Sequence, residues 1–403
     1  MATSTTTKSP VVVSPNAGAL AIRGGTPVTT TKIQVVSITI SEDDIAAVTA
    51  VLRSGMVAQG PKVLELEKQF GAASEAKHAV ACANGTCALQ MAYQPMIEPG
   101  DEVLCPAWSY YATASMICAV GATPVWVDAD PNTYCIDVAD AARKVTGKTT
   151  AIAATHLYGN PCDIDAIGKL AADKALSVIY DAAQSHLAMY KNRGIGAYGD
   201  ATTYSFYPTK NMTTGEGGMV TTNDADLDAR LRALRSHGES QKYVHASIGY
   251  NFRMTDVEAA MGLSQLSRLA GLTAKRQNNA EALTTLLKDC PGIFTPTTTT
   301  HGTHVYHQYA LRLDPERLVA PKDQSLRDAF TAALNAEGIA TALHYPRPLT
   351  RQPVFDVAGV QHQPVADHLG TTVFCIPVHH NLTPDQIRQI AEAVHKVAAA
   401  FRA

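Results

Sequence analysis

From about residue 78 onwards, short apolar runs alternate with helix-like segments, and this alternation constrains the fold more than any other feature. The runs AVACA, EVLCP, TPVWVDA, TAIAATH and LSVIYDA have the length of strands and are rich in β-branched residues. Helices are expected between them, over residues 87–96, 112–120, 164–172 and 225–236. The pattern predicts an α/β fold, with a mostly parallel sheet between two layers of helices. Right-handed crossovers then place the strand-to-helix loops at one edge of the sheet, where ligands bind.

Three parts of the chain can be distinguished. Residues 1–18 are rich in Ser, Thr, Ala and Pro, which predicts a flexible tail. A long amphipathic helix is expected to start at Thr255 and to continue towards residue 288. We place a boundary near it, between a large domain at 19–275 and a smaller C-terminal α/β domain at 276–403. A chain of 403 residues is long enough for two separate cores.

Charge and cysteine content exclude several classes of protein. The net charge of −3 gives no electrostatic case for nucleic acid, and no apolar run approaches the ~20 residues that span a bilayer. The eight cysteines are scattered, without C-x-x-C pairs or the spacing of metal ligands. They predict reduced, mostly buried thiols in a cytoplasmic protein that holds no metal.

The stretch YSFYPTKNMTTGEGGMVTT, residues 204–222, surrounds Lys210 with hydroxyls and glycines. It is expected to form a strand, a polar loop and a second strand. A lysine in such a loop could capture an aldehyde or a phosphate. Composition alone favours the simpler interpretation, a solvated lysine in a hairpin.

Two other segments favour a site at the same edge. Asp181 ends the apolar strand SVIYD, where it could face the ring nitrogen of a heterocyclic cofactor or cap a helix. The turn Asn84-Gly85-Thr86 follows a strand and opens a helix. Its N–H groups and hydroxyl could bind a phosphate, or form an ordinary helix cap.

Together these segments resemble the DegT/DnrJ/EryC1/StrS family of pyridoxal-5′-phosphate (PLP) dependent aminotransferases, which have the fold-type I architecture of aspartate aminotransferase. The matching motifs run in order from about residue 20 to the C-terminus and include AIRGGTPV, ANGTCAL, YDAAQSH, SFYPTKNMTTGEGG, GYNFRMTD, HYPRPL and IPVHHNLT. Two departures are small. Cys87 stands where the family more often has a small or acidic residue, and the segment after His186 lacks a glycine.

The resemblance assigns a role to each matching residue. Lys210 would hold PLP as a Schiff base, and Asp181 would pair with its pyridine nitrogen. The other cofactor contacts would be Gln184 to the ring 3-hydroxyl, Tyr110 stacked on the ring, Gly85, Thr86 and Ser205 around the phosphate, and Asn251 on the phosphate of a neighbouring subunit. This last contact implies a homodimer with shared sites.

The resemblance also implies the reaction: transfer of an amino group from an amino acid, glutamate or glutamine, to a keto sugar or keto-cyclitol in amino-sugar or antibiotic biosynthesis. The opening AIRGGTPV is similar to that of members acting on cyclitol ketones. Substrate contacts are expected from polar residues in otherwise apolar stretches: His344, Tyr345, Arg253 and His307, with Tyr309 and the pair His379–His380 as weaker candidates. Each histidine or tyrosine could instead be a satisfied structural side chain, and Arg253 could instead form an ion pair at an interface.

Two other functions are compatible with the same motifs. A PLP enzyme of this family could catalyse dehydration or cyclisation instead of transamination, because one scaffold hosts many reactions. Relatives that dehydrate replace the lysine with histidine, so Lys210 argues against that branch. The third alternative is a PLP-binding regulatory protein without catalysis, although the chain has no appended DNA-binding module.

Overall fold

The computed structural model describes residues 19–356, 359 and 363–403, so the tail predicted at 1–18 lies outside the described residues. Its centre is a seven-stranded sheet in the order β1-β9-β8-β5-β4-β2-β3. Within this sheet β9 alone is antiparallel to its neighbours, which confirms the predicted mostly parallel sheet. The strands are β1 (His78–Cys82), β2 (Glu102–Pro106), β3 (Thr123–Val127), β4 (Thr149–Thr155), β5 (Ser177–Asp181), β8 (Ala201–Ser205) and β9 (Gly218–Thr222).

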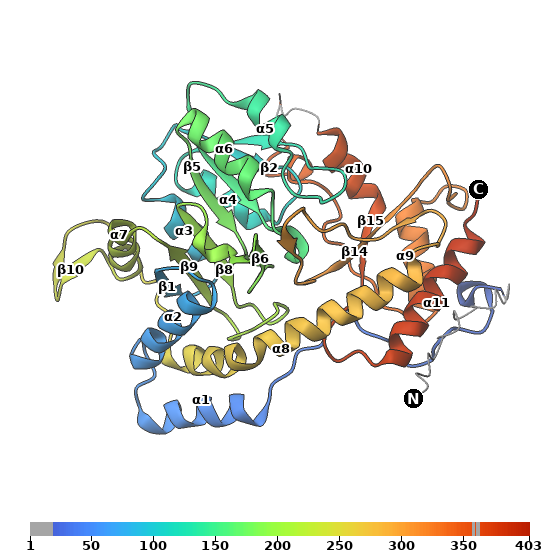
Figure 1. Cartoon of the computed structure of the whole chain (residues 1–403), viewed down its shortest axis with the longest axis horizontal. Coiled ribbons are helices and arrows are strands. Elements are labelled where there is room, and N and C mark those ends of the chain that lie inside the picture. Colours follow the sequence, from blue (N-terminus) through green and yellow to red (C-terminus); the bar gives the residue numbers. More distant parts are fainter. Residues whose placement is uncertain (1–18, 357–358, 360–362) are drawn as a thin grey trace, which may run out of the picture.

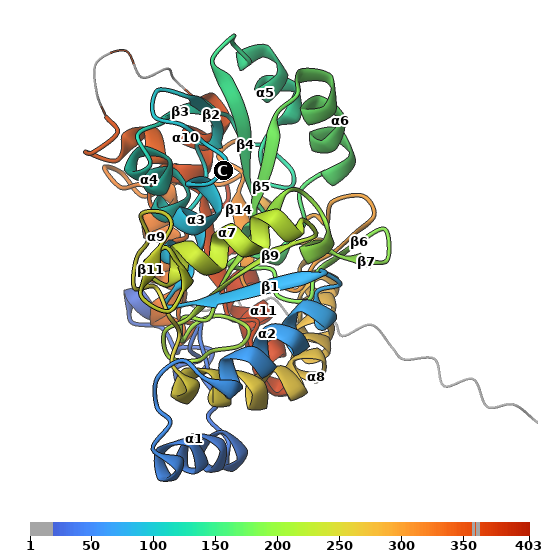
Figure 2. The same ribbon diagram turned by 90° about the vertical axis from the view of Figure 1, so that its left-hand side faces the viewer.

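Helices cover both faces of this sheet, as Figures 1 and 2 show. Alternate residues of a strand point to opposite faces, so Val80 and Cys82 belong to one core and Ala79 and Ala81 to the other. The first face packs against α3 (Gly85–Tyr93), α4 (Tyr111–Ala119) and α7 (Ala225–Arg235), and the second against α2 (Pro61–Ala73), α5 (Val138–Lys144), α6 (Ile164–Lys174) and the first half of α8 (Asp256–Leu287).

Local sequence signals account for most helix ends. Ser41 caps α1 (Glu42–Ser54) in a capping box with Asp44, as its acidic first turn predicts. The helix expected at 87–96 instead starts at Gly85, because the Asn84 side chain accepts from the N–H of Cys87. It ends at Tyr93, shortly before Pro95, which has no N–H to continue the helix.

A second core lies beside the three-stranded antiparallel sheet β12-β14-β15. Its elements are β12 (Ile293–Phe294), β14 (Tyr309–Leu313), β15 (Val373–Ile376), α9 (Leu326–Ala336), α11 (Pro384–Ala400) and the C-terminal end of α8, with α10 (Pro364–Thr372) nearby. The segment TALHYP, residues 341–346, joins this sheet through a bridge between Ala342 and Cys375. Shorter pairs complete the fold: β6 (Met189–Tyr190), β7 (Arg193–Gly194) and β13 (Gly302–Thr303), and the hairpin β10 (Glu239–Gln241) and β11 (Val244–His245).

The N-terminal segment packs on this second core. Leu20 and Ile33 are buried in it, and the fully buried Glu337 accepts hydrogen bonds from the N–H groups of Ala21 and Val28 at 2.9 and 3.0 Å. The ammonium group of Lys396 lies 2.8 Å from the same carboxylate. The boundary proposed near residue 275 falls inside α8, whose two ends contribute to different cores.

Side chains cover the outer edge of β1, the first strand of the large sheet. The buried carboxylate of Glu67 accepts from the N–H of Ala81 at 3.0 Å. Arg235 donates to the carbonyl of Ala81 and Arg232 to that of Ala79, each at 3.0 Å, and both guanidinium groups pair with Glu67. Because these side chains occupy three of the outward-facing backbone groups, they hinder pairing of this edge with another chain.

Candidate active site

The predicted cofactor residues gather where parallel strands end. Gly85 and Thr86 follow β1, Tyr110 lies in the loop after β2, Asp181 ends β5, Ser205 ends β8, and Lys210 lies in the loop after β8. This is the sheet edge at which α/β proteins of this topology bind ligands.

Asp181 is almost fully buried and fixed from two sides. Its Oδ2 accepts a hydrogen bond of 2.7 Å from the hydroxyl of Thr113 on α4, and its Oδ1 accepts one of 3.0 Å from the N–H of Ala183. The second contact is local, because the chain turns directly after β5. A carboxylate held in this way is a preorganised anion for the nitrogen of a bound heterocycle.

Lys210 lies close enough to Asp181 for their charges to interact. Part of the side chain stays accessible, but burial of the amine lowers its pKa to about 8, and the attraction of Asp181 only partly opposes this shift. Burial also lowers the pKa values of His186, His307 and His344, and the positive charge of Lys210 lowers them further. The amine therefore loses its proton near neutral pH among imidazoles that stay uncharged.

A phosphate cradle forms where the start of α3 meets the end of β8. A Cβ atom on Gly85 would lie 2.7 Å from Cβ and 3.1 Å from Oγ of Ser205, so only glycine allows this approach. The helix leaves the N–H groups of its first turn without intrahelical acceptors, which suits an anion. Behind the turn, β9 passes so close that a Cβ on Gly218 would meet the carbonyl of Asn84 at 2.3 Å.

An aromatic wall stands beside Gln184. The amide of Gln184 donates to the hydroxyl of Tyr345 at 2.9 Å, and its Oε1 accepts from the N–H of Tyr158 at 2.7 Å. The ring of Tyr345 lies 6.1 Å from that of Tyr110 and 6.0 Å from that of Trp108. Tyr110 itself is more than half exposed, as a residue that lines an open site would be.

The other predicted residues are placed at different distances from this centre. His344 lies beside Lys210, and its carbonyl accepts from the hydroxyl of Tyr158. The carbonyl of Phe252 accepts from the N–H of Ala83 at 2.8 Å, so the GYNFR segment with Asn251 and Arg253 runs along the phosphate cradle. Asn251 is exposed. The weaker candidates lie elsewhere: Tyr309 is in the second core, and His379 and His380 contact α8 and the N-terminal segment.

Sequence reasoning missed several groups of the site. Thr113 and Trp108 have no local sequence signal, because only the packing of α4 and the β2 loop brings them to Asp181 and Tyr345. His186 could have been found, since it stands two residues after Gln184 and its Nε2 lies 2.8 Å from the carbonyl of Ser205.

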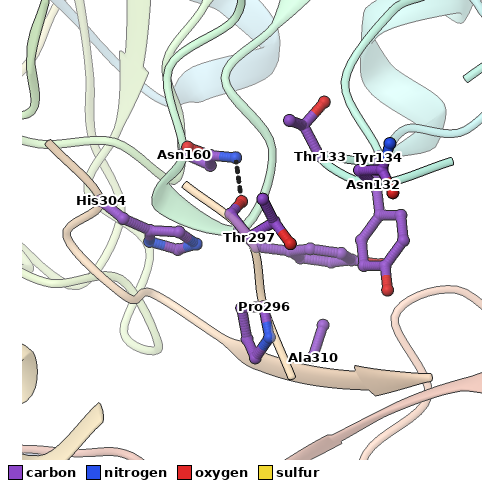
Figure 3. Close-up of a pocket in the computed structure, with 9 residues that line it drawn as sticks. Asn132, Thr133, Tyr134, Asn160, Pro296, Thr297, His304 and Ala310 are labelled. Carbon is purple, nitrogen blue, oxygen red and sulfur yellow. Dashed lines mark hydrogen bonds between the residues drawn. The ribbon is translucent and has the colours of Figure 1, made fainter. Parts of the chain in front are cut away.

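A small pocket of about 10 Å³, enough for one water molecule, lies among the residues drawn in Figure 3. Its lining includes Tyr134, Asn160 and His304 but not Lys210 or Asp181, so it is separate from the candidate site. Within the described ranges, no three acidic, histidine or cysteine side chains group as metal ligands would. Over the same ranges, the helices are too short or too polar to cross a membrane.

The site fits PLP group by group. The Gly85–Ser205 cradle suits a phosphate, the carboxylate of Asp181 suits a ring nitrogen, and the desolvated amine of Lys210 suits an aldehyde. These three groups come from three separate strand ends, and the fold brings them to one place.

Comparison with known proteins identifies the same chemistry. A model of the DegT/DnrJ/EryC1/StrS aminotransferase family matches residues 38–395. The pleiotropic regulatory protein of Geobacillus stearothermophilus is 39% identical over 358 residues, which cover 87% of this chain and 92% of that protein. The UDP-N-acetyl-3-dehydro-alpha-D-glucosamine 3-aminotransferase of Acidithiobacillus ferrooxidans is 38% identical over 340 residues, which cover 82% and 87%.

The solved structures include DesV from S. venezuelae, with a TM-score of 0.86 and 33% identity over 92% of this chain and 99% of that one. The fold is therefore that of the PLP-dependent sugar aminotransferases, as the sequence predicts. With the family model extending over most of its length, the chain belongs to the DegT/DnrJ/EryC1/StrS family of PLP-dependent aminotransferases.

Proposed function

We propose that Lys210 is the residue that binds PLP covalently and carries protons in an amino transfer from glutamate or glutamine to a keto sugar. The observation that carries this proposal is the desolvated amine of Lys210 beside the hydrogen-bonded carboxylate of Asp181. In an aminotransferase PLP supplies a ring that accepts electrons when bound. The remaining work falls to the side chains of the chain itself.

Each of these side chains has a physical task. The neutral Nζ of Lys210 can accept a proton from the donor α-carbon and return it, because its lowered pKa of about 8 leaves part of the amine unprotonated near neutral pH. Asp181 holds a fixed negative charge at the ring nitrogen. Gly85, Thr86 and Ser205 hold the phosphate, Gln184 the ring hydroxyl and Tyr110 the ring face. We expect His344 and Tyr345 to contact sugar hydroxyls and Arg253 to meet an anionic group of the substrate.

A nucleotide-linked keto sugar is the acceptor that we favour over a free cyclitol. The relative from A. ferrooxidans is named for a UDP-linked 3-dehydro sugar. The segment AIRGGTPV, which resembles cyclitol-specific members, contacts Glu337 and the second core. Its packing explains the motif by folding, so the motif is weak support for a cyclitol. A role in antibiotic biosynthesis stays a prediction.

We also propose a homodimer in which Asn251 reaches the phosphate in the neighbouring subunit. Asn251 is exposed, although it lies on a segment that runs along the cradle. Exposed apolar side chains occur on α1, at Ile45 and Leu52, and in or just after the hairpin of β10 and β11, at Tyr243, Val244 and Ile248. Exposed apolar side chains of this size favour contact with another chain. All eight cysteines are free, and six of them are buried, which supports a reducing compartment such as the cytoplasm.

The decisive experiment uses the purified protein loaded with PLP. Glutamate, glutamine and other amino acids are added singly, and the absorbance spectrum of the cofactor is followed. UDP- and dTDP-linked keto sugars and a keto-cyclitol are then offered as acceptors, and mass spectrometry identifies the aminated product. We expect the spectrum to change with glutamate or glutamine, and amination of a nucleotide-linked sugar.

One relative raises the alternative of a regulatory protein, because the protein from G. stearothermophilus is named a pleiotropic regulatory protein. A non-catalytic PLP-binding protein would keep its spectrum unchanged with every donor. That result would exclude the amino transfer proposed here, even if PLP remained attached to Lys210.

A further inference from the structure

Asn211, the residue that follows Lys210, is buried and uses both ends of its amide. Its Nδ2 donates to the carbonyl of Val305 at 3.2 Å, and its Oδ1 lies 3.3 Å from Nδ1 of His307. A carbonyl can only accept, so the amide must present Nδ2 to Val305 and Oδ1 to His307. The hydrogen of this second contact is therefore carried by Nδ1 of His307.

This arrangement fixes the tautomer of His307. With the hydrogen on Nδ1, the Nε2 atom is an acceptor, and it lies 3.5 Å from Nε2 of Gln308. The imidazole stays neutral, because its burial lowers its pKa well below the usual value. The positive charges of Lys210 and Arg276 lower this pKa further, and so do His344 and His186. His307 therefore links two elements without adding a positive charge beside the lysine.

Residues 305–308, which contact Asn211, are also hydrogen-bonded to the segment that supports Gln184. The N–H of Val305 donates to the carbonyl of Gly159 at 2.9 Å, and that of Gln308 donates to the carbonyl of Tyr158 at 3.2 Å. Gly159 has a φ of +99°, and a Cβ there would lie 2.9 Å from the backbone nitrogen of His307. The N–H of Tyr158 in turn donates to Oε1 of Gln184. Residues 305–308 therefore connect the loop of Lys210, through Asn211, with the segment that holds Gln184.

We infer that Asn211 and His307 are positioning residues: their hydrogen bond clamps the lysine loop to residues 305–308 and holds the amine of Lys210 in its desolvated place. This role rests on the proposed function of Lys210. It differs from the substrate contact expected for His307, because both ring nitrogens of His307 are directed at protein groups.

The chain offers a matched control for this clamp. Asn160 is also buried, and its amide holds a nearby stretch, residues 297–299, by bonds of 3.0 Å to the carbonyl of Thr297 and from the N–H of Thr299. It does so without touching the lysine loop. Asn211→Ala and Asn160→Ala therefore each remove a buried amide that holds part of the chain between α8 and β14, and only the first opens the clamp.

The test measures the protonation of Lys210 in the apoprotein, by competitive labelling with acetic anhydride across pH and mass spectrometry of the peptide. The groups facing this amine are Asp181, His186, His307 and His344. In Asn211→Ala water should reach the amine again, and the pH midpoint of its labelling should rise by about one unit from about 8. At a pH below the midpoint, the fraction of neutral amine should then be about tenfold lower. His307→Phe should act alike, whereas Asn160→Ala should keep the wild-type midpoint.

Turnover gives the second reading, since a displaced lysine should lower kcat by about tenfold with little change in KM. If both alanine variants lose stability equally and leave the labelling midpoint unchanged, the clamp is merely structural and the inference is overturned. His307→Phe decides the matter if Asn211→Ala does not fold. Failure of the wild-type protein to bind PLP would refute the proposed function instead, and the labelling result would be unaffected by it.

Discussion

The hydroxyl of Thr113 donates a 2.7 Å hydrogen bond to Oδ2 of Asp181, and it does so from a different element, the helix α4. Thr113 is itself 3.1 Å from the hydroxyl of Ser109, which is 2.8 Å from that of Thr155. Because the Thr113 hydrogen is used on the carboxylate, Ser109 must donate to Thr113 and accept from Thr155. A directed chain of three hydroxyls thus ends on the anion of the site.

Removing the end of this chain should weaken the site. Thr113→Val keeps the side-chain shape but deletes a hydrogen bond to a charged group, worth about 1.5–3 kcal/mol, or about 10- to 150-fold. We expect PLP affinity and kcat to fall within that range. Thr113→Ser retains the hydroxyl and should behave almost as wild type. Titration of the apoprotein with PLP and steady-state kinetics provide the measurements, and equal behaviour of the two variants would contradict the role.

Lys210 predicts how the stability of the apoprotein depends on pH. Its pKa falls on folding, from 10.5 to about 8, so the unfolded chain binds more protons between these values. The free energy of unfolding should therefore gain a contribution that rises with pH across this window, as the cost of the buried ammonium disappears. Urea denaturation of wild type and Lys210→Met isolates this contribution, because groups that do not interact with Lys210 cancel in the difference and the three neighbouring histidines stay neutral across this pH window.

In that comparison, Lys210→Met should be the more stable protein below pH 8, and its advantage should shrink as the pH approaches 10.5. Asp181→Asn removes the charge that raises the lysine pKa, so the window should extend to lower pH. A difference between wild type and Lys210→Met that does not vary with pH would show that the amine is not desolvated in solution.

The phosphate cradle depends on the missing side chain of Gly85. In Gly85→Ala the new Cβ would meet Ser205 at 2.7 Å, and relieving such overpacking costs about 1–3 kcal/mol. We expect PLP affinity to fall by about 10-fold or more, with a smaller loss for pyridoxal, which lacks the phosphate. Gly168→Ala is the control, because nothing beyond the backbone of α6 itself lies within 4 Å of the Cβ position. That variant should be stabilised by about 0.4–1 kcal/mol and bind PLP normally.

The sequence could predict the groups that depend on chain order but not those that depend on packing. Asp181 and Gly85 follow directly from strands, so the rule that parallel strands end at one edge is enough to bring them together. Thr113 reaches Asp181 only through the seating of α4 on the sheet, which no local pattern encodes. His307 appeared to be a polar group free for substrate, because its partner Asn211 lies 96 positions earlier in the chain.

The domain boundary illustrates a similar limit. A continuous amphipathic pattern predicts α8 well, but it cannot show that the two ends of one helix serve different cores. The sequence likewise gives no reason for Leu20 and Ile33 to pack with residues near the C-terminus. Such contacts are fixed by the balance of burial over the whole molecule.

Shared sites in a homodimer predict complementation between two inactive variants. Lys210→Ala and Asn251→Ala subunits, unfolded and refolded together, should form mixed dimers in which one site receives both changes and the other receives neither. With random pairing, about a quarter of wild-type activity should return, because half of the dimers are mixed and half of their sites are intact. Each variant refolded alone gives the baseline. No recovery in dimers shown by mass photometry to be mixed would contradict a shared site.

The last prediction concerns the fold that carries the site. Glu67 compensates two guanidinium groups and satisfies the N–H of Ala81 in the interior, so Glu67→Ala leaves charged and polar groups buried without a partner. Loss of one partner of a buried ion pair typically costs about 3–5 kcal/mol. Glu65, two positions earlier on the same helix, pairs with Lys62 on the surface, where such pairs contribute about 0–1 kcal/mol.

Glu67→Ala should therefore lower the melting temperature strongly, whereas Glu65→Ala should change it little. Glu67→Ala also uncovers the edge of β1, so light scattering should detect aggregation of this variant during heating. Equal melting temperatures of Glu67→Ala and Glu65→Ala would mean that water takes the place of the Glu67 carboxylate beside Arg232 and Arg235. An unchanged scattering profile in a destabilised Glu67→Ala protein would show that α2 and α7 shield the strand without the help of this charge.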